Sequence, residues 1–234
     1  EEGMVILPSG TYNMGSNFLT NEQPIHTVSI NSFYISDHSV TASEYKLCVD
    51  STICNYNGGT ARNYTFGMTG KENHPITYIS WGDAQTFILW LKQNSNMNFR
   101  LCSEAEYEYA VRGGTTTEYW CGDNFSCLDN NEWIPTNNNG TSQVVKTMSA
   151  NPWGLFDMHG NGKDWVQDLH HSDYTGAPTD GSAWEINSGR SERGSRGASW
   201  ESIDPLNQLR SSYRSFYPPS ARYEGLTFRL CADL

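Results

Sequence analysis

The segment Asn151–Trp165 has the sequence NPWGLFDMHGNGKDW, and two shorter motifs follow it, RGASW at Arg196–Trp200 and RYEGLTFRL at Arg222–Leu230. Longer motifs precede it: MVILPSGTYNMGS (Met4–Ser16), EQPIHTVSI (Glu22–Ile30), FYISDHSVTASEY (Phe33–Tyr45), HPITYISWGDAQTFILWL (His74–Leu91) and RLCSEAEYEYAVRGG (Arg100–Gly114). The motifs are spread over nearly the whole chain, from Met4 to Leu230, so no conclusion from them depends on a single match. Between Arg190 and Leu234 the only cysteine is Cys231.

Motif by motif, the chain resembles the formylglycine-generating enzymes, the sulfatase-modifying-factor family. The resemblance implies one α+β domain over residues 1–234 with a C-type-lectin-like fold, rich in loops, with few short strands and helices. In this fold the N- and C-terminal strands lie together. A chain of 234 residues is long enough to bury a substantial core within one domain.

The resemblance also implies where the family's chemistry would lie. In the family, two cysteines just after the GGSW or GGSY motif bind copper and activate oxygen. Here the corresponding stretch, Glu201–Asn207, has the sequence ESIDPLN and contains no cysteine. Carboxylate, hydroxyl and amide groups cannot replace a thiolate as a soft copper ligand. We therefore predict a domain without copper and without this oxidase activity.

Capping boxes mark the helix starts, because a Ser or Thr is followed three residues later by Glu or Asp. They occur at Thr41–Glu44, Ser80–Asp83 and Ser103–Glu106, and the last helix should end at Gly113–Gly114. Short strands are expected at Met4–Pro8, His26–Ile30, Phe33–Ile35, Phe99–Leu101 and Thr227–Cys231. Few helices, few strands and long loops rich in Asn, Gly, Thr and Ser predict the α+β class.

The net charge of −11 argues against a sequence-independent nucleic-acid binder, which needs a basic face toward phosphates. Within residues 190–234, seven arginines against five acidic residues give a local balance of +2, so the other 189 residues sum to −13. We therefore expect a ligand at the C-terminal face to avoid the acidic field of the rest of the molecule. The sequence has no run of 18 apolar residues that could span a membrane.

Two cysteine pairs share one short spacing within turn-rich loops, which favours local disulfides: Cys48 with Cys54, and Cys121 with Cys127. Cys102 and Cys231 remain, and the family fold places their strands near each other. Six free thiols are the alternative, whereas zinc lacks a C-x2-C pair or a nearby His. Disulfides indicate an oxidising compartment. Together with the abrupt start at Glu1, they predict an extracytoplasmic protein, secreted or at the cell surface, whose leader or anchor has been trimmed.

The family motif D/N-x-x-G-N-V-x-E-W wraps a calcium ion, and its counterpart here is DMHGNGKDW. Carried over residue by residue, the ligands would be the side chains of Asp157 and Asp164 and the backbone carbonyls of Gly160 and Gly162. Calcium prefers such a mixed set of oxygens. A turn without metal is the alternative, because Asp is shorter than Glu and Gly162 loosens the loop. The family's second calcium site would fall at Asn131–Glu132, where a following acidic ligand is missing.

Other classes of site have weaker support. Four histidines lie inside the structural motifs, where hydrogen-bonded core or turn roles are expected: His26, His38, His74 and His159. His170–His171, flanked by Asp168 and Asp173, is a candidate transition-metal site, but adjacent histidines usually point apart. The chain has no G-x-S-x-G elbow, no Walker loop and no dinucleotide fingerprint.

Residues 196–230 alternate motif anchors with positions of mixed character, in which Tyr and Phe stand among Ser and Pro. This composition is typical of recognition surfaces, although an aromatic loop that packs over the core is the alternative. The segment also resembles the variable region of proteins diversified by retroelements, which place variable positions on this scaffold between RGGSW and GFRL. The predicted ligand-binding residues are Trp200, Glu201, Ser202, Ile203, Leu206, Tyr213, Ser215, Phe216, Tyr217, Ser220, Tyr223, Glu224, Leu226 and Thr227.

We therefore predict a non-catalytic, receptor- or adhesin-like protein that displays this surface on a scaffold held by disulfides and calcium. Its partner would be a protein or another macromolecule on a cell surface. The alternatives are a divergent oxidoreductase of the formylglycine-generating family and a structural or regulatory paralogue.

Overall fold

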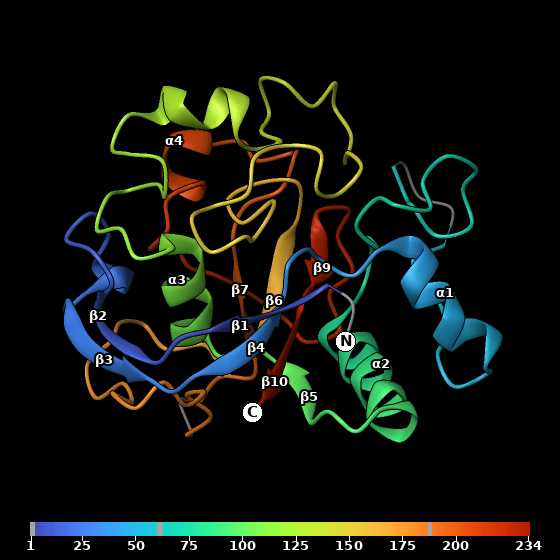
Figure 1. Ribbon diagram of the computed structural model, residues 1–234, viewed down its shortest axis with the longest axis horizontal. Coiled ribbons are helices and arrows are strands. Elements are labelled where there is room, and N and C mark those ends of the chain that lie inside the picture. Colours follow the sequence, from blue (N-terminus) through green and yellow to red (C-terminus); the bar gives the residue numbers. More distant parts are fainter. Residues whose placement is uncertain (1–2, 60–62, 187–188) are drawn as a thin grey trace.

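The structure is a computed structural model and describes residues 3–59, 63–186 and 189–234. This part of the chain forms two four-stranded sheets and one two-stranded sheet. The two four-stranded sheets lie near the middle of the molecule (Figure 1). Helices α1 (Ala42–Asp50) and α2 (Trp81–Asn94) lie on one side of them, and α3 (Glu104–Arg112) and the two-stranded sheet lie on the other. The α+β class and the C-type-lectin-like fold are thereby confirmed.

The first sheet has the order β1-β4-β10-β5, with strands at Met4–Leu7, Phe33–Ser36, Leu230–Asp233 and Phe99–Leu101. Its pairings are all antiparallel, and Ile35 of β4 stands opposite both Val5 of β1 and Cys231 of β10. The N- and C-terminal strands therefore flank β4, as the resemblance implied. Cys231 is bonded to Cys102, directly after β5, with Cα atoms 5.0 Å apart.

The second sheet has the order β8-β7-β6-β9, with strands at Ser215–Tyr217, Arg193–Arg196, Lys163–Leu169 and Leu226–Phe228. Strand β6 is antiparallel to β7 and parallel to β9. The expectation of one strand at Thr227–Cys231 is wrong, because Phe228 ends β9 and Leu230 begins β10 in the other sheet. Arg229 stands at this crossover with its side chain buried against Asp164.

The third sheet pairs β2 (Gly10–Met14) with the expected strand β3 (His26–Ile30). The other two predicted disulfides are also present, Cys48–Cys54 and Cys121–Cys127. All six cysteines of the chain are therefore cross-linked.

The capping boxes are confirmed in all three predicted helices, α1 (Ala42–Asp50), α2 (Trp81–Asn94) and α3 (Glu104–Arg112). Gly113 ends α3 with a φ of 55°, a left-handed conformation that glycine adopts without a steric penalty. Every residue of α3 is buried, including its three glutamates. Buried carboxylates require partners. Arginines of the C-terminal segment pair with Glu104 and Glu108.

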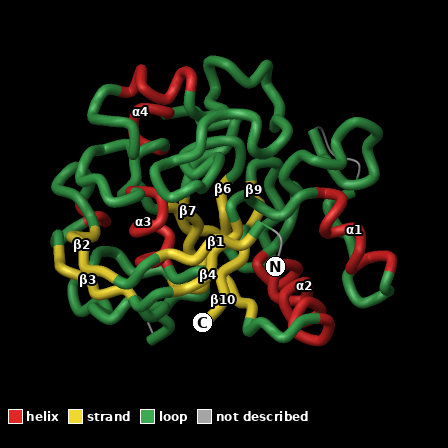
Figure 2. Tube along the Cα trace, in the orientation of Figure 1, coloured by secondary structure: helices red, strands yellow, loops and turns green. Residues whose placement is uncertain are grey.

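Three short elements complete the secondary structure of the described residues: η1 (Thr20–Glu22), η2 (Phe125–Asn130) and α4 (Pro205–Gln208). Figure 2 shows that loops make up most of the half of the molecule above the sheets. Along the described chain, no helix is both long and apolar enough to cross a membrane.

Candidate functional site

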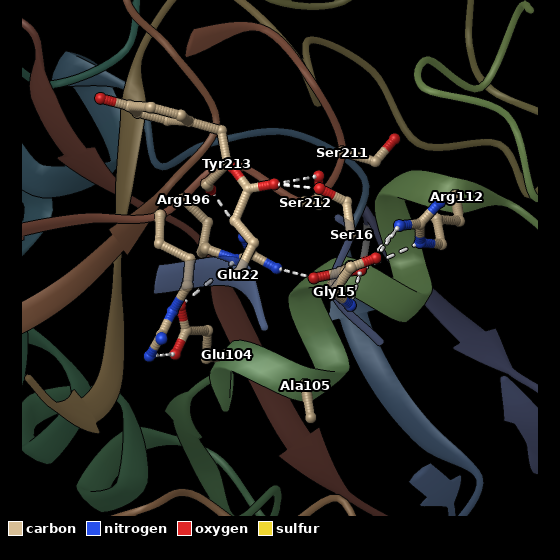
Figure 3. Close-up of polar contacts among 12 residues, drawn as sticks. Gly15, Ser16, Glu22, Glu104, Ala105, Arg112, Arg196, Ser211, Ser212 and Tyr213 are labelled. Carbon is tan, nitrogen blue, oxygen red and sulfur yellow. Dashed lines mark hydrogen bonds and ion pairs between the residues drawn. The ribbon is translucent and has the colours of Figure 1, made fainter. Parts of the chain in front are cut away.

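The C-terminal segment links β7 to β9 through α4 and β8, and buried arginines hold it in place. Arg196 is fully buried and donates to a carboxylate oxygen of Glu108 and, at 2.5 Å, to the carbonyl of Tyr213. Arg210 donates to both carboxylate oxygens of Glu22 at 2.7 and 2.6 Å. Figure 3 shows part of this network around α3.

Three more arginines pair with carboxylates, of which Arg214 and Arg229 are buried and Arg222 is half-buried. The pairs are Arg214 with Glu104 (2.7 and 2.8 Å), Arg222 with Asp83 (2.8 and 3.0 Å) and Arg229 with Asp164 (3.0 Å). We call Arg196, Arg210, Arg214, Arg222 and Arg229 the arginine frame. Paired guanidinium–carboxylate bonds fix direction as well as distance. The positive surplus of residues 190–234 is thus largely neutralised by carboxylates from other elements. The expectation of a C-terminal face outside the acidic field is therefore wrong.

The predicted ligand-binding residues fall into three groups by exposure. Four are buried, with 6%, 6%, 1% and 0% of their surface exposed: Trp200, Ser202, Leu226 and Thr227. The exposed members are Ile203, Leu206, Ser220 and Tyr223, and the half-buried members are Glu201, Tyr213, Ser215, Phe216, Tyr217 and Glu224. The four buried residues correct the sequence-based set, because β9 and the turn after β7 carry their side chains inward.

Two of the half-buried aromatic residues have neighbours within the domain. The Phe216 ring stacks on His170 with ring centroids 4.0 Å apart. The Tyr217 ring meets Trp165 edge-on at 6.1 Å, and its hydroxyl lies 3.3 Å from Lys163 Nζ. Both rings therefore pack against the domain and keep part of their surface exposed. They combine features of the two alternatives drawn from the sequence, a recognition surface and an aromatic loop packed over the core.

The histidine pair does not form a metal site in this structure. His170 stacks on Phe216, while His171 stacks on Trp184 with ring centroids 3.5 Å apart. Among residues 3–59, 63–186 and 189–234, no group of three or more His, Cys, Asp or Glu side chains could hold a metal ion. Stacking on two different rings gives the adjacent histidines separate structural roles.

A pocket of about 350 Å³ opens beside the exposed group. It is lined by Tyr78, Glu201, Tyr217, Arg222, Tyr223 and Glu224, and we call it the Tyr–Glu pocket. Four of these six residues belong to the predicted ligand-binding set. The pocket therefore brings together Glu201, which follows β7, with Tyr217 of β8 and the turn before β9.

The two carboxylates of this pocket influence each other. Burial, followed by the nearby Glu224 carboxylate, raises the pKa of Glu201 to about 7. Burial and then Glu224 also raise the pKa of Tyr78 to about 12, and its hydroxyl donates to Glu224 Oε2 at 3.4 Å. Without a ligand, Glu201 is therefore partly protonated near neutral pH.

The stretch that would hold copper in the family does not fit that metal here. Residues 201–207 form a turn and the start of α4, and none of them is a cysteine. All six cysteine sulfurs of the chain are in disulfides, so no thiolate is free to approach this stretch. The donor set thus lacks the soft ligands that copper requires.

The turn at the predicted calcium site fits a hard cation in part. Asp157 and Asp164 are buried, and one carboxylate oxygen of each, Oδ1, has no hydrogen-bond partner. The other oxygen of Asp157 accepts from the Lys146 backbone N–H at 3.0 Å, and that of Asp164 accepts from Arg229. Burial raises the pKa of Asp157 to about 6, although the Lys146 backbone N–H and the Arg229 charge oppose this rise. Partnerless buried carboxylate oxygens are the feature that a bound cation would satisfy.

The second candidate calcium position has its backbone carbonyl occupied. The Glu132 carbonyl accepts from Asn137 Nδ2 at 2.9 Å, and Asn131 donates its amide to the Cys127 carbonyl. Burial, followed by the charge of Asp157, raises the pKa of Glu132 to about 8. A largely protonated side chain beside an occupied carbonyl does not suit calcium.

Sequence reasoning missed Tyr78 as a pocket residue. It precedes the capping Ser80 of α2 and has a φ of 58°, which is unusual for an aromatic residue. Strain of this kind concentrates at functional sites. The sequence offers no signal for it, because only the packed fold carries Tyr78 to the C-terminal turn.

Comparison with known proteins agrees with this geometry. The model of the sulfatase-modifying factor enzyme 1-like domain matches residues 1–234. The formylglycine-generating enzyme of Mycobacterium tuberculosis is 28% identical over 70% of this chain and 73% of its own length. The Streptomyces coelicolor enzyme is 26% identical over 99% of this chain and 89% of its own length. A serine/threonine-protein kinase, pkn1 of Chlamydia pneumoniae, is 28% identical, and this chain spans only 38% of it.

Solved structures share the fold over almost the whole chain. PvdO from Pseudomonas aeruginosa superposes with a TM-score of 0.87 at 28% identity, covering 99% of this chain and 94% of PvdO. Variable protein 1 of Treponema denticola superposes with a TM-score of 0.82 at 24% identity, covering 99% of this chain and 95% of that protein.

Proposed function

Because the chain belongs to the sulfatase-modifying factor enzyme 1-like family, we propose that it uses the family scaffold to bind a macromolecular ligand without catalysis. The contact surface is the exposed and half-buried part of residues 201–224, together with the Tyr–Glu pocket. Receptor- or adhesin-like recognition of a protein at a cell surface is the role that we assign to it.

One observation carries this proposal: the arginine frame and the exposed side chains alternate along the same segment. Arg210 and Arg214 are buried at 3% and 2% exposure, whereas Ile203 is 94% exposed and Leu206 is 60% exposed. Anchors of this kind fix the backbone without help from the outward side chains. Exposed residues can therefore change with little effect on stability, which is what a recognition surface requires.

The copper stretch supports the non-catalytic part of the proposal, since residues 201–207 supply no thiolate. The similarity to a variable protein adds only that this fold occurs in such a protein. A divergent oxidoreductase remains the competing proposal. Tight stoichiometric copper binding with turnover of a thiol peptide would favour it over ours.

Two matched display libraries test the proposal. The first randomises the exposed residues Ile203, Leu206, Ser220 and Tyr223, and the control randomises the buried residues Trp200, Ser202, Leu226 and Thr227. Most members of the first library should stay protease-resistant, because exposed substitutions usually change stability by within about 0.5 kcal/mol. Most members of the control should unfold, because buried truncations cost about 2–5 kcal/mol.

The folded first library should also yield binders to an unrelated target protein such as lysozyme. A library that folds but gives no binder would contradict a recognition surface at these positions. A library that unfolds like its control would show that the exposed side chains belong to the scaffold.

We also propose that Asp157 and Asp164 hold a structural calcium ion, which would satisfy their partnerless oxygens. Calcium at about 100 times its dissociation constant should stabilise the fold by about 2.7 kcal/mol over EDTA-treated protein. Thermal melts check this, with magnesium and Asp157→Asn as controls. Identical melting with calcium and with EDTA would contradict the proposal.

The disulfides support a location outside the cytoplasm. Three cross-links persist in oxidising compartments, whereas cytosolic reductants keep most thiols free. We propose that the protein is secreted or displayed at a cell surface, where a macromolecular partner would be accessible.

A further inference from the structure

The Tyr–Glu pocket combines aromatic rings with paired carboxylates. The Tyr217 and Tyr223 rings meet at 62° with centroids 5.5 Å apart. Glu201 and Glu224 line the same cavity, and Asn63 Nδ2 and the Tyr78 hydroxyl donate to Glu224 at 3.3 and 3.4 Å. Aromatic faces attract cations, and carboxylates attract them more strongly.

We infer that the Tyr–Glu pocket binds an alkylammonium group, of the kind that a lysine side chain on a partner protein presents. The inference rests on the proposed function, because it names the chemistry by which the same surface recognises its ligand. Tyr217 and Tyr223 would flank the ammonium group, and Glu201 and Glu224 would balance its charge.

The charges of the described pocket residues leave room for one added cation. Arg222 is neutralised by Asp83, which accepts from it with both carboxylate oxygens. Lys163 lies near Tyr217, with its Nζ 5.9 Å from the ring centroid, and offsets one of the two glutamates. One negative charge therefore remains unbalanced when both glutamates are ionised.

The protein's own Lys163 shows that a primary ammonium group is compatible with this site. Its Nζ lies 3.3 Å from the Tyr217 hydroxyl. A ligand ammonium group would extend this arrangement to Tyr223, whose side chain is 52% exposed. The volume of about 350 Å³ is large enough for an alkylammonium chain end.

Behind the pocket, beside Glu201, lies a buried polar group without a partner. Ser199 Oγ is fully buried and has no hydrogen-bond partner. A Cβ on Gly225 would stand 2.6 Å from this oxygen and 2.7 Å from Glu201 Oε1, so the hydroxyl lies close to the carboxylate. A side chain at position 225 would crowd Glu201, so Gly225 leaves room for this carboxylate beside the pocket.

Two other ligand classes fit less well. An anionic ligand would meet the two glutamates and be repelled. A metal ion needs a converging ligand set, and within the described part of the chain no group of three His, Cys, Asp or Glu residues provides one. An organic cation uses the rings as well as the carboxylates.

The protonation of Glu201 links ligand binding to pH, and this link can be measured. Burial and Glu224 raise the pKa of Glu201 to about 7, and a bound cation would lower it by favouring the charged form. The charged and titratable groups that face Glu201 are Glu224, Tyr78, Lys163 and Arg222, and the pH dependence of binding is assigned to Glu201. Binding should therefore be roughly tenfold or more tighter at about pH 8 than at about pH 5.5, and should release a proton at neutral pH.

The test is calorimetric titration of the protein with Nα-acetyl-lysine methylamide. Its Nε-acetylated form, which has no charge, is the ligand control, and putrescine distinguishes a free diamine from a lysine side chain. Glu224→Gln should lose most of the binding and its pH dependence. Asp129→Asn, which removes a charge from an exposed residue outside both the contact surface and the pocket lining, should bind like the wild type.

Equal binding of the acetylated ligand, or no saturable binding to wild type at either pH, would overturn the inference. Tighter binding of putrescine than of the lysine derivative would overturn the partner-protein source. If Glu224→Gln does not fold, wild-type titrations in buffers of different ionisation enthalpy still test the inference. They measure whether ligand binding releases a proton, and no release at neutral pH would overturn it. If the protein does not bind the lysine derivative but the library of exposed positions folds and yields binders, this inference is wrong and the proposed function is not contradicted.

Discussion

At the scale of single residues, Arg229 is the point at which the chain passes between its two large sheets. Its guanidinium donates to Asp164 and to the carbonyls of Ser36 and Phe156, at 3.0, 3.1 and 2.9 Å. It thereby ties β4, β6 and the Asp157 turn to the start of β10. Removing it would leave a buried carboxylate and two carbonyls without their donor.

We therefore predict that Arg229→Met lowers the free energy of unfolding by about 3–5 kcal/mol, the usual cost of breaking a buried ion pair. Lys46→Met is the matched control, because it removes an exposed Lys46–Asp50 pair. That pair lies on the surface of α1, where such contacts contribute about 0–1 kcal/mol. Urea unfolding checks both variants, and equal losses would contradict a structural role for the crossover arginine.

At the scale of elements, the helices were predictable because their caps are local. Thr41, Ser80 and Ser103 each bond within three residues, so the signal lies in a short stretch of sequence. Strand β7 has the sequence RGSR and no apolar alternation, so the partners on either side, β6 and β8, determine it. The break between β9 and β10 falls at the buried Arg229. No hydrophobic periodicity in the sequence predicts this break.

The glycines that end or interrupt helices provide a prediction at this scale. Gly113→Ala should destabilise the protein, because its φ is 55° and an added Cβ would meet Pro152 at 3.0 Å. Gly82→Ala, within α2, should stabilise it by about 0.5–1 kcal/mol, since alanine favours helices and the nearest atom lies 3.8 Å away. Melting temperatures in opposite directions are the expected result. A gain at both positions would show that the left-handed cap is not required.

At the scale of the whole molecule, long-range pairs join the C-terminal segment to the rest of the chain. Cys102–Cys231 spans 129 residues, and Arg210 reaches Glu22 across 188. The family resemblance implied the disulfide, but the carboxylate partners of the arginine frame could not be read from the sequence. Pairing at such separations depends on packing rather than on spacing. The Tyr–Glu pocket is hidden for the same reason, since Tyr78 and Glu224 meet only in the folded chain.

The central claim is that a fixed arginine frame carries a surface that is free to vary. Sequencing the codons for residues 1–234 of this gene across sibling strains tests it most directly. We predict codon differences concentrated at exposed positions such as Ile203, Leu206 and Tyr223, with Arg210 and Arg214 unchanged. Differences spread evenly along the chain, or concentrated at the buried arginines, would contradict the account.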